Sequence, residues 1–141
     1  MKISIIGAGN VGGLTAMRLV EAGLPDVLLV DVARGLAQGK ALDLEDSGSI
    51  FKYNYHIQGT EDIKDTRDSD IIIITAGLTR KPGMTREDLS NKNAQILKDL
   101  CLVIKNISPR AIAIIVTNPL DLMTYLALKI TDFKPNKVFG M

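Results

Sequence analysis

The chain has 141 residues, with 46% hydrophobic residues, 23% charged residues and a net charge of +1. These values are typical of one soluble globular domain that is large enough to bury a core. A nucleic-acid partner would require a strongly basic surface, and a membrane helix would require a run of about 20 apolar residues. The sequence offers neither, so we expect no nucleic-acid and no membrane partner. The single cysteine, Cys101, excludes an internal disulfide and favours a reducing, cytoplasmic location.

The first half of the chain alternates short apolar runs with helical patterns. In chain order, the pattern predicts a strand, a helix, a strand, a helix and a weaker strand at residues 2–6, 11–22, 27–31, 34–47 and 55–59. The residues at helical spacing in the first of these helices are Val11, Leu14, Thr15, Leu19 and Ala22, and the second helix carries Leu36, Lys40, Leu42 and Leu44. The segment that follows the third strand is polar and rich in turn-forming residues.

The second half continues the same alternation. It predicts a strand, a helix, a strand, a helix and the start of a strand at residues 71–75, 87–107, 111–117, 120–130 and 137–139. The run of isoleucines in the first of these strands is the strongest strand signal of the chain. The long helix carries Asn93, Leu97 and Ile104 on one stripe.

The apolar strands indicate the fold class. Strands that are apolar at every position must be covered on both faces, which favours a parallel sheet between layers of helices. With right-handed crossovers, the pattern predicts a doubly wound α/β domain of the Rossmann type, with about six strands in the order 3-2-1-4-5-6. We expect residues 1–141 to form this dinucleotide-binding domain and a catalytic, substrate-binding domain to be absent from the chain.

The segment "GAGNVG", Gly7–Gly12, fits the pattern G-x-G-x-x-G between a strand and a helix. Gly7 would allow the tight turn, Gly9 would let the backbone approach a pyrophosphate, and Gly12 would let the helix pack closely. The helix N-terminus would offer free N–H groups and a positive dipole to the phosphates. The sequence therefore predicts a dinucleotide site at this turn.

Asp31 ends the second strand, about 20 residues after the glycines, where this fold places an acidic residue. Its carboxylate would accept hydrogen bonds from the adenosine ribose and would repel a 2′-phosphate. A purely structural role, capping the following turn, is the alternative. Arg34 could attract such a phosphate, but Asp31 should dominate, so NAD is the expected cofactor.

Two further segments follow strands and should therefore lie near the cofactor, "TAG" at Thr75–Gly77 and "TNP" at Thr117–Pro119. Asn118 has two possible roles. It could cap the last long helix, with Pro119 at the first helical position. Its amide could also donate to a substrate oxygen or contact the nicotinamide ribose.

A loop with two arginines follows the fourth strand. Pro82-Gly83 marks a turn between Arg80 and Arg86, and Thr85 with Asp88 forms a capping-box pattern for the helix that follows. A guanidinium matches a carboxylate with two parallel hydrogen bonds and stays charged when water leaves. Two arginines on one mobile loop would suit a dicarboxylate substrate, although exposed arginines are usually only solvated.

These motifs together resemble one family. "GAGNVG", Asp31, "KALDLEDS", "TAGLTRKPGMTREDL", "NKN" and "VTNPLD" match, in order and over the whole chain, the NAD-dependent malate dehydrogenases of the lactate-dehydrogenase-like branch. Lactate dehydrogenases share the surrounding pattern, but they generally have glutamine where this chain has Arg80. The resemblance implies an oxidoreductase that interconverts (S)-malate and oxaloacetate with NAD, and a parent protein that forms dimers or tetramers.

The resemblance also implies roles for single residues. Arg80 would bind the distal carboxylate of malate or oxaloacetate, Arg86 would polarise the keto oxygen, and Asn118 would contact the substrate. Positions matching the family's cofactor contacts are Gly7, Ala8, Gly9, Asn10, Val11, Gly12, Asp31, Asn93, Val116, Thr117 and Asn118.

One part of the family's machinery is missing from the chain. Its general acid and base is a histidine, and the only histidine here, His56, matches none of the family's roles. We expect His56 to be structural or solvated, Cys101 to be packed rather than nucleophilic, and the chain alone to be inactive. No metal site is expected. Two other functions stay open: a lactate or other 2-hydroxy-acid dehydrogenase, and a catalytically silent nucleotide-binding module.

Overall fold

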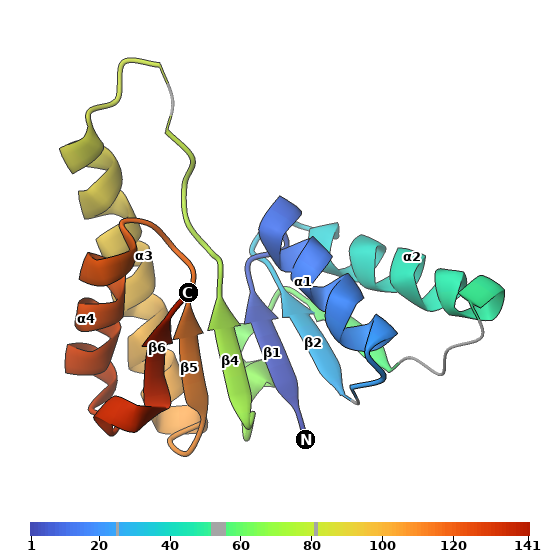
Figure 1. Cartoon of the computed structure of the whole chain (residues 1–141). Coiled ribbons are helices and arrows are strands. Elements are labelled where there is room, and N and C mark those ends of the chain that lie inside the picture. Colours follow the sequence, from blue (N-terminus) through green and yellow to red (C-terminus); the bar gives the residue numbers. More distant parts are fainter. Residues whose placement is uncertain (25, 52–55, 81) are drawn as a thin grey trace.

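The computed structural model describes residues 1–24, 26–51, 56–80 and 82–141, without the side chain of residue 51. In these residues, six strands form one parallel sheet in the order β3-β2-β1-β4-β5-β6. The strands are β1 (Ile3–Ile6), β2 (Val27–Val30), β3 (Ile57–Thr60), β4 (Ile71–Ile74), β5 (Ile112–Ile115) and β6 (Val138–Gly140). The doubly wound α/β fold and its strand order are confirmed (Figure 1).

Helices fill the connections between the strands. The α-helices are α1 (Asn10–Glu21), α2 (Leu36–Phe51), α3 (Arg86–Ile107) and α4 (Leu120–Thr131), and the 3₁₀ turns are η1 (Ile63–Thr66) and η2 (Pro135–Lys137). α2 continues four residues past its predicted end at residue 47. The third strand was expected to start at residue 55, which lies outside the described residues. No helix of the described segments is long and apolar enough to cross a membrane.

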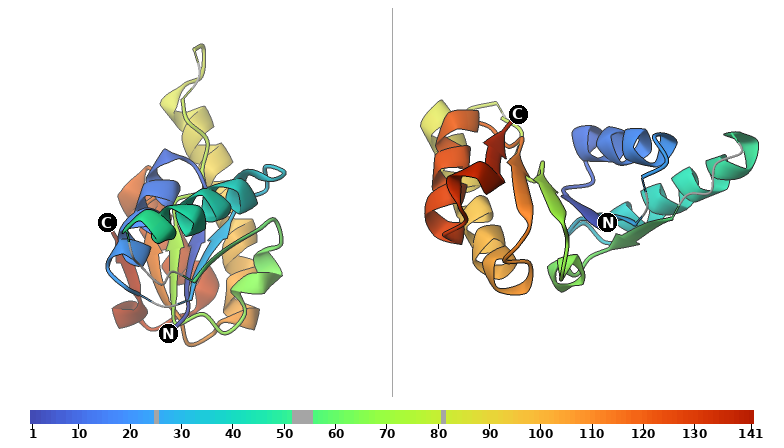
Figure 2. Two further views of the ribbon diagram at one scale, coloured as in Figure 1. Left: turned by 90° about the vertical axis from the view of Figure 1, so that its right-hand side faces the viewer. Right: turned by 60° about the horizontal axis from the view of Figure 1, so that its bottom comes forward.

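Two layers of helices enclose the sheet. α1 and α2 lie on one face, and α3 and α4 lie on the other (Figure 2). Alternate residues of one strand serve both layers, because successive side chains of a strand point to opposite faces. In β4, Ile73 packs with the α1/α2 layer, whereas Ile72 and Ile74 pack with α3 and α4.

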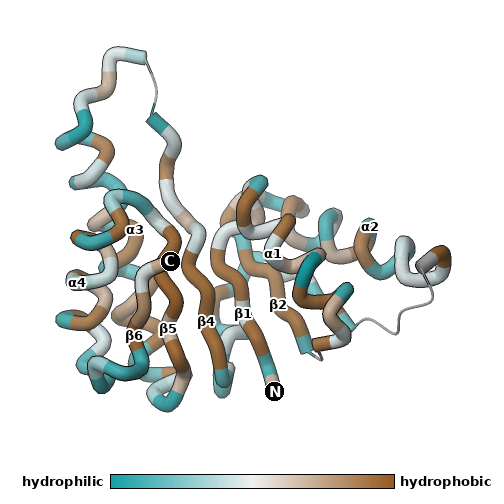
Figure 3. The backbone as a smooth tube through the Cα atoms, viewed as in Figure 1, coloured by the Kyte–Doolittle hydropathy of each residue, from teal (hydrophilic) through white to brown (hydrophobic). Residues whose placement is uncertain are grey.

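Helices cover both faces of the sheet only at the central strands. Every residue of β1 and β2 is buried, and Figure 3 shows both strands as mainly hydrophobic. In β5, by contrast, Ala113 and Ile115 are buried, while Ile112 and Ile114 stay partly exposed. The prediction of full coverage is therefore wrong for β5, because α1 and α2 lie against β1, β2 and β3.

The buried faces of α1 and α2 also differ from the prediction. Val11 and Leu14, expected on the inner stripe of α1, are 56% and 55% exposed. The buried residues of this helix are Gly12, Ala16 and Val20. Small residues on the inner face let a helix approach a sheet more closely than leucine would allow.

α2 makes a similarly close approach through small residues. Ala37 and Ala41 are buried on this helix, while Leu36 and Leu42 are exposed. Opposite Ala37, β3 carries Gly59, and a Cβ added to Gly59 would lie 2.3 Å from the Ala37 carbonyl carbon and oxygen. The contact is between two backbones, so it cannot be relieved by rotating a side chain.

Gly59→Ala should therefore lower the free energy of unfolding by about 1 to 3 kcal/mol or more, as expected when a well-packed interior must move apart. Urea denaturation followed by circular dichroism measures this change. Gly39→Ala is the control, because Gly39 is exposed on α2 and has open space around its Cβ position. It should stabilise the chain by roughly 0.5 to 1 kcal/mol through helix propensity. Equal effects of the two substitutions would contradict this packing argument.

Candidate functional site

The glycine-rich segment lies where the sequence predicts. It leaves the carboxyl end of β1 and opens α1, whose N-cap is Gly9. Gly7 and Ala8 are buried, whereas Gly9 and Asn10 are exposed. The exposed half of the loop therefore presents the N-terminus of α1 to solvent, together with its free N–H groups.

The three motif glycines are required for different reasons. Gly7 has a φ of +108°, and a Cβ there would lie 2.7 Å from the Ala76 nitrogen. A Cβ on Gly12 would lie 1.8 Å from the Gly7 oxygen. A Cβ on Gly9 would meet nothing within 4 Å. The fold itself therefore demands Gly7 and Gly12, while nothing in the described protein demands Gly9.

Asp31 lies directly after β2 and binds the same loop. One carboxylate oxygen accepts a hydrogen bond from the Ala8 N–H at 2.6 Å, and the other accepts from the Ala33 N–H at 2.8 Å. The side chain thus orients the glycine loop and caps the turn after β2. A carboxylate can accept about four hydrogen bonds, so Asp31 keeps acceptor capacity for a ligand.

Lys40 contacts the glycine loop from α2, and sequence reasoning gave it no role. Its Nζ donates to the Gly9 oxygen at 3.1 Å. This contact brings a positive charge to the N-terminus of α1, where the helix dipole already favours an anion. The pairing depends on how α1 and α2 pack, so no motif in the sequence could have revealed it.

Threonine side chains join the carboxyl ends of three strands. Thr75, after β4, donates its hydroxyl to the Gly7 oxygen after β1 at 3.0 Å. Thr117, after β5, donates its hydroxyl to the Ala76 oxygen after β4 at 2.7 Å. These hydrogen bonds hold the loops after the three strands in fixed positions relative to one another.

Asn93 adds a link from α3. Its side chain is 2% exposed. Its Oδ1 accepts from the Leu78 N–H at 2.8 Å, and its Nδ2 donates to the Asn118 oxygen at 2.9 Å. Asn93 therefore connects the start of the arginine loop to the loop after β5.

Asn118 does not cap α4, contrary to one of its two predicted roles. The helix begins at Leu120 and its N-cap is Pro119, without a side-chain hydrogen bond, because the extended backbone of Pro119 delays the helix by one residue. The Asn118–Pro119 peptide bond is cis. Asn118 is exposed, and its side chain has no hydrogen bond with the residues that the structure describes. Next to it, Val116 is partly exposed and Thr117 is buried.

The capping box before α3 is confirmed. The Thr85 hydroxyl accepts from the Asp88 N–H, and the Asp88 carboxylate accepts from the Thr85 N–H, both at 3.0 Å. Hydrogen bonds from the Thr85 side chain and backbone hold the pKa of Asp88 below its usual value. The far end of the arginine loop is thereby fixed to α3.

The two arginines are not brought to the glycine loop. The segment between β4 and α3 rises above the carboxyl ends of the strands (Figure 1). Arg80 and Arg86 are exposed, and the Arg80 Nε donates to the Met84 oxygen at 3.0 Å. In this open position the loop would have to move before either guanidinium reached a ligand beside Gly9.

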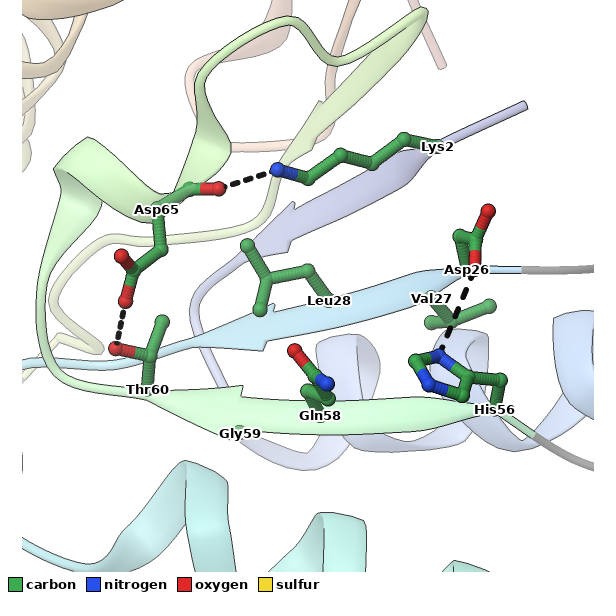
Figure 4. Close-up of a pocket in the computed structure, with 9 residues that line it drawn as sticks. All are labelled: Lys2, Asp26, Val27, Leu28, His56, Gln58, Gly59, Thr60 and Asp65. Carbon is green, nitrogen blue, oxygen red and sulfur yellow. Dashed lines mark hydrogen bonds and ion pairs between the residues drawn. The ribbon is translucent and has the colours of Figure 1, made fainter.

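His56 lies directly before β3, at the amino end of that strand and away from the loops at the carboxyl ends. It borders an open pocket of about 470 Å³ over β2 and β3, which Lys2, Leu28 and Gln58 also line (Figure 4). The His56 Nδ1 lies 3.5 Å from a carboxylate oxygen of Asp26, and both side chains are more than half exposed. This arrangement fits the expected solvated role of His56.

The described residues contain no group of three or more His, Cys, Asp or Glu side chains placed to hold a metal ion. Cys101 lies on the buried face of α3 and is 1% exposed, within the core that α3 and α4 share. Burial raises the pKa of its thiol to about 12. The prediction that Cys101 is a packed residue is confirmed.

The fold and the site together define a class. A glycine-rich turn at the N-terminus of α1, an acidic residue after β2 and this strand order are the features of a dinucleotide-binding α/β domain. Residues 1–140 match the family described as lactate/malate dehydrogenase, NAD binding domain. The chain belongs to this family.

Relatives of known name agree with that assignment. The malate dehydrogenase of Methanosarcina mazei is 51% identical over 141 residues, covering 100% of this chain and 46% of that protein. The malate dehydrogenase of Archaeoglobus fulgidus, solved in complex with NADH, has a TM-score of 0.95 and 42% identity, covering 100% of this chain and 48% of that one. A lactate dehydrogenase of Cryptosporidium parvum, solved with lactic acid and cofactor, has a TM-score of 0.92 and 40% identity over 99% of this chain and 44% of that one. The chain thus spans about half the length of the relatives it matches.

The buried thiol gives a prediction about reactivity and pH. At pH 8, Cys101 should resist the thiol reagent DTNB in the folded chain and react fully in urea, because only the thiolate is nucleophilic. Rapid labelling of the native chain would contradict the assignment of Cys101 as a packed residue.

The raised pKa also predicts a pH dependence of stability. An unfolded thiol loses its proton near pH 9, whereas the folded thiol keeps it to about pH 12. The free energy of unfolding should therefore fall as the pH rises between these values, and it should fall more steeply than in Cys101→Ala.

Proposed function

We propose that this chain is the NAD-binding half of an oxidoreductase that interconverts (S)-malate and oxaloacetate. The observation that carries the choice of substrate is the pair of arginines after β4, the strand that is paired with β1: Arg80 lies on the loop and Arg86 is the first residue of α3. A monocarboxylate needs one cation for its carboxylate, whereas a dicarboxylate needs a second cation for its distal group. The malate dehydrogenases among the relatives support the same choice.

The residues around the turn fit a dinucleotide. The open space at Gly9 would admit a pyrophosphate against the free N–H groups of α1, and Lys40 would add a positive charge behind them. The spare acceptor capacity of Asp31 would serve the adenosine ribose hydroxyls. Its negative charge would repel a 2′-phosphate, which favours NAD over NADP. When bound, NAD would accept or donate the hydride of the reaction.

The substrate would lie between the strand ends and the arginine loop. Asn118, exposed after β5, would donate its amide to a substrate oxygen. Closure of the loop would bring Arg80 to the distal carboxylate. Arg86, the first residue of α3, would extend its guanidinium to the keto oxygen, where a positive charge stabilises the developing alkoxide. Val116 and Thr117 would line the nicotinamide side. The proton would be handled by a histidine in the rest of the protein, since His56 lies over β2 and β3.

Two other functions remain as alternatives. The family includes lactate dehydrogenases, and one of them is 40% identical to this chain. A substrate with one carboxylate would leave Arg80 without a partner, which is why we favour malate. A nucleotide-binding module without catalysis would keep the glycine turn and Asp31 but would give the arginine loop no task.

We further propose that the parent protein is a homo-oligomer, either a dimer or a tetramer. The single buried thiol suits a reducing compartment, and we propose a cytoplasmic location.

Gly9→Ala tests the cofactor site. Gly9 has a φ of −64°, which alanine adopts freely, and its Cβ position is open, so the chain should fold with a stability within about 1 kcal/mol of the original. The added methyl group would lie where the pyrophosphate approaches, and the dissociation constant for NADH should rise by roughly tenfold or more, equivalent to about 1.4 kcal/mol. Calorimetric titration measures this change, and Gly39→Ala should leave it unaltered. Unchanged NADH binding in Gly9→Ala would exclude this site.

Arg80→Gln tests the substrate. Residues 1–141 can be joined to the remaining half of the Methanosarcina mazei malate dehydrogenase, and this chimera should oxidise NADH with oxaloacetate, whereas the 141-residue chain alone should not. In the chimera, Arg80→Gln should lower kcat/KM for oxaloacetate, because a substrate carboxylate loses its charged partner. The corresponding loss of transition-state stabilisation should be on the order of 2 to 5 kcal/mol. It should raise kcat/KM for pyruvate.

Arg110→Gln is the matched control, because Arg110 is an exposed arginine at the amino end of β5. It should leave the ratio of the two substrates unchanged. If Arg80→Gln also left this ratio unchanged, the dicarboxylate role of Arg80 would be wrong. A chimera that prefers pyruvate without any substitution would favour the lactate alternative.

A further inference from the structure

We propose that Asn93 is a positioning residue that fixes the base of the arginine loop to the loop that carries Asn118. This inference rests on the proposed function, because it concerns how the substrate-binding groups are held. It differs from a direct contact between Asn93 and NAD, which the positioning role does not require.

The two hydrogen bonds of Asn93 use both ends of its carboxamide. The oxygen faces the Leu78 N–H at 2.8 Å, and the nitrogen faces the Asn118 carbonyl at 2.9 Å. Reversing the amide would place like groups against each other at both ends, so its orientation is determined. The side chain is 2% exposed, and water does not compete for these hydrogen bonds as it does at the surface.

Gly77 shows how tightly this junction is packed. A Cβ on Gly77 would lie 2.9 Å from the Thr117 Cγ2 and 3.3 Å from the Asn93 Oδ1. The backbone before Leu78 is therefore held between the loop after β5 and α3. A loop that moves from this point can begin to move only after Leu78.

The other end of the loop is fixed as well. Thr85 and Asp88 close the capping box on α3, and Gly83 between the two fixed ends has a φ of +83°. Among the described residues, 79, 80 and 82–84 therefore lie between the two fixed ends and can change conformation, and Arg80 is one of them. Because Asn93 holds both Leu78 and the Asn118 carbonyl, the start of this segment and the backbone of Asn118 keep a constant separation.

The unmodified 141-residue chain provides the first test, by amide hydrogen exchange measured with NMR. The Leu78 amide should exchange at least tenfold more slowly than the Thr79 and Arg80 amides, which form no hydrogen bond with a described residue. Exchange of Leu78 as fast as Thr79 would overturn the proposal. This test needs no substitution and no activity.

Asn93→Asp in the active chimera provides the second test. A carboxylate keeps the acceptor for Leu78 but loses the donor to Asn118 and repels its carbonyl. The KM for oxaloacetate should rise about tenfold, and by a larger factor than the dissociation constant for NADH. A residue that acts only through contact with NAD would instead raise the dissociation constant for NADH by the larger factor, and an unchanged KM would also overturn the proposal.

The control is Asn106→Asp, the same change on an exposed residue of the same helix, which should alter neither constant. An unmodified chimera without oxaloacetate-dependent NADH oxidation would refute the proposed function, and the exchange of Leu78 would then decide the role of Asn93. If Asn93→Asp fails to fold, the exchange of the Leu78 amide in the unmodified chain likewise decides the role of Asn93.

Discussion

The site depends on the register of the parallel strands β1, β4 and β5. Ile6, Ile74 and Ile115 are paired across these strands, so the residues that follow them leave the sheet at one edge. The backbone after each strand has lost its sheet partners, and buried polar groups must find others. Threonine hydroxyls and the Asn93 carboxamide provide them in the loops after all three strands. The arrangement of the loops therefore follows from the need to satisfy the backbone where the sheet ends.

Close backbone approach is the second constraint, and it explains where sequence reasoning succeeded and failed. The roles of Gly7 and Gly12 in the fold followed from a motif whose spacing encodes the turn itself. The inner faces of α1 and α2 were predicted wrongly, because large apolar residues were assumed to point inward. Here alanines and glycines point inward, Leu14, Leu36 and Leu42 are exposed, and Leu19 and Leu44 pack against the core only in part. A single sequence does not show which face of a helix a strand or another helix approaches so closely.

Hydrogen bonds between residues that are close in the sequence could be predicted, whereas contacts between distant segments could not. The capping box of Thr85 and Asp88 lies within four residues, so the sequence contains both partners. Asn118 was expected to cap α4 on the same kind of evidence, but the helix starts one residue later than the proline pattern suggested. The contacts of Lys40 with Gly9 and of Asn93 with Leu78 join segments that the fold alone brings together.

The separation of the arginines from the glycine turn follows from their charge. An arginine held in a dry crevice without an anion would lose its hydration and gain no partner, which costs several kcal/mol. In the proposed function, an exposed loop would avoid that cost until a carboxylate arrived, and the carboxylate would then supply the free energy for closure. For such a loop to work, its ends must stay fixed while its middle moves. The capping box fixes one end, and Asn93 fixes the other beside Asn118, so closure would bring Arg80 toward an asparagine that has not moved.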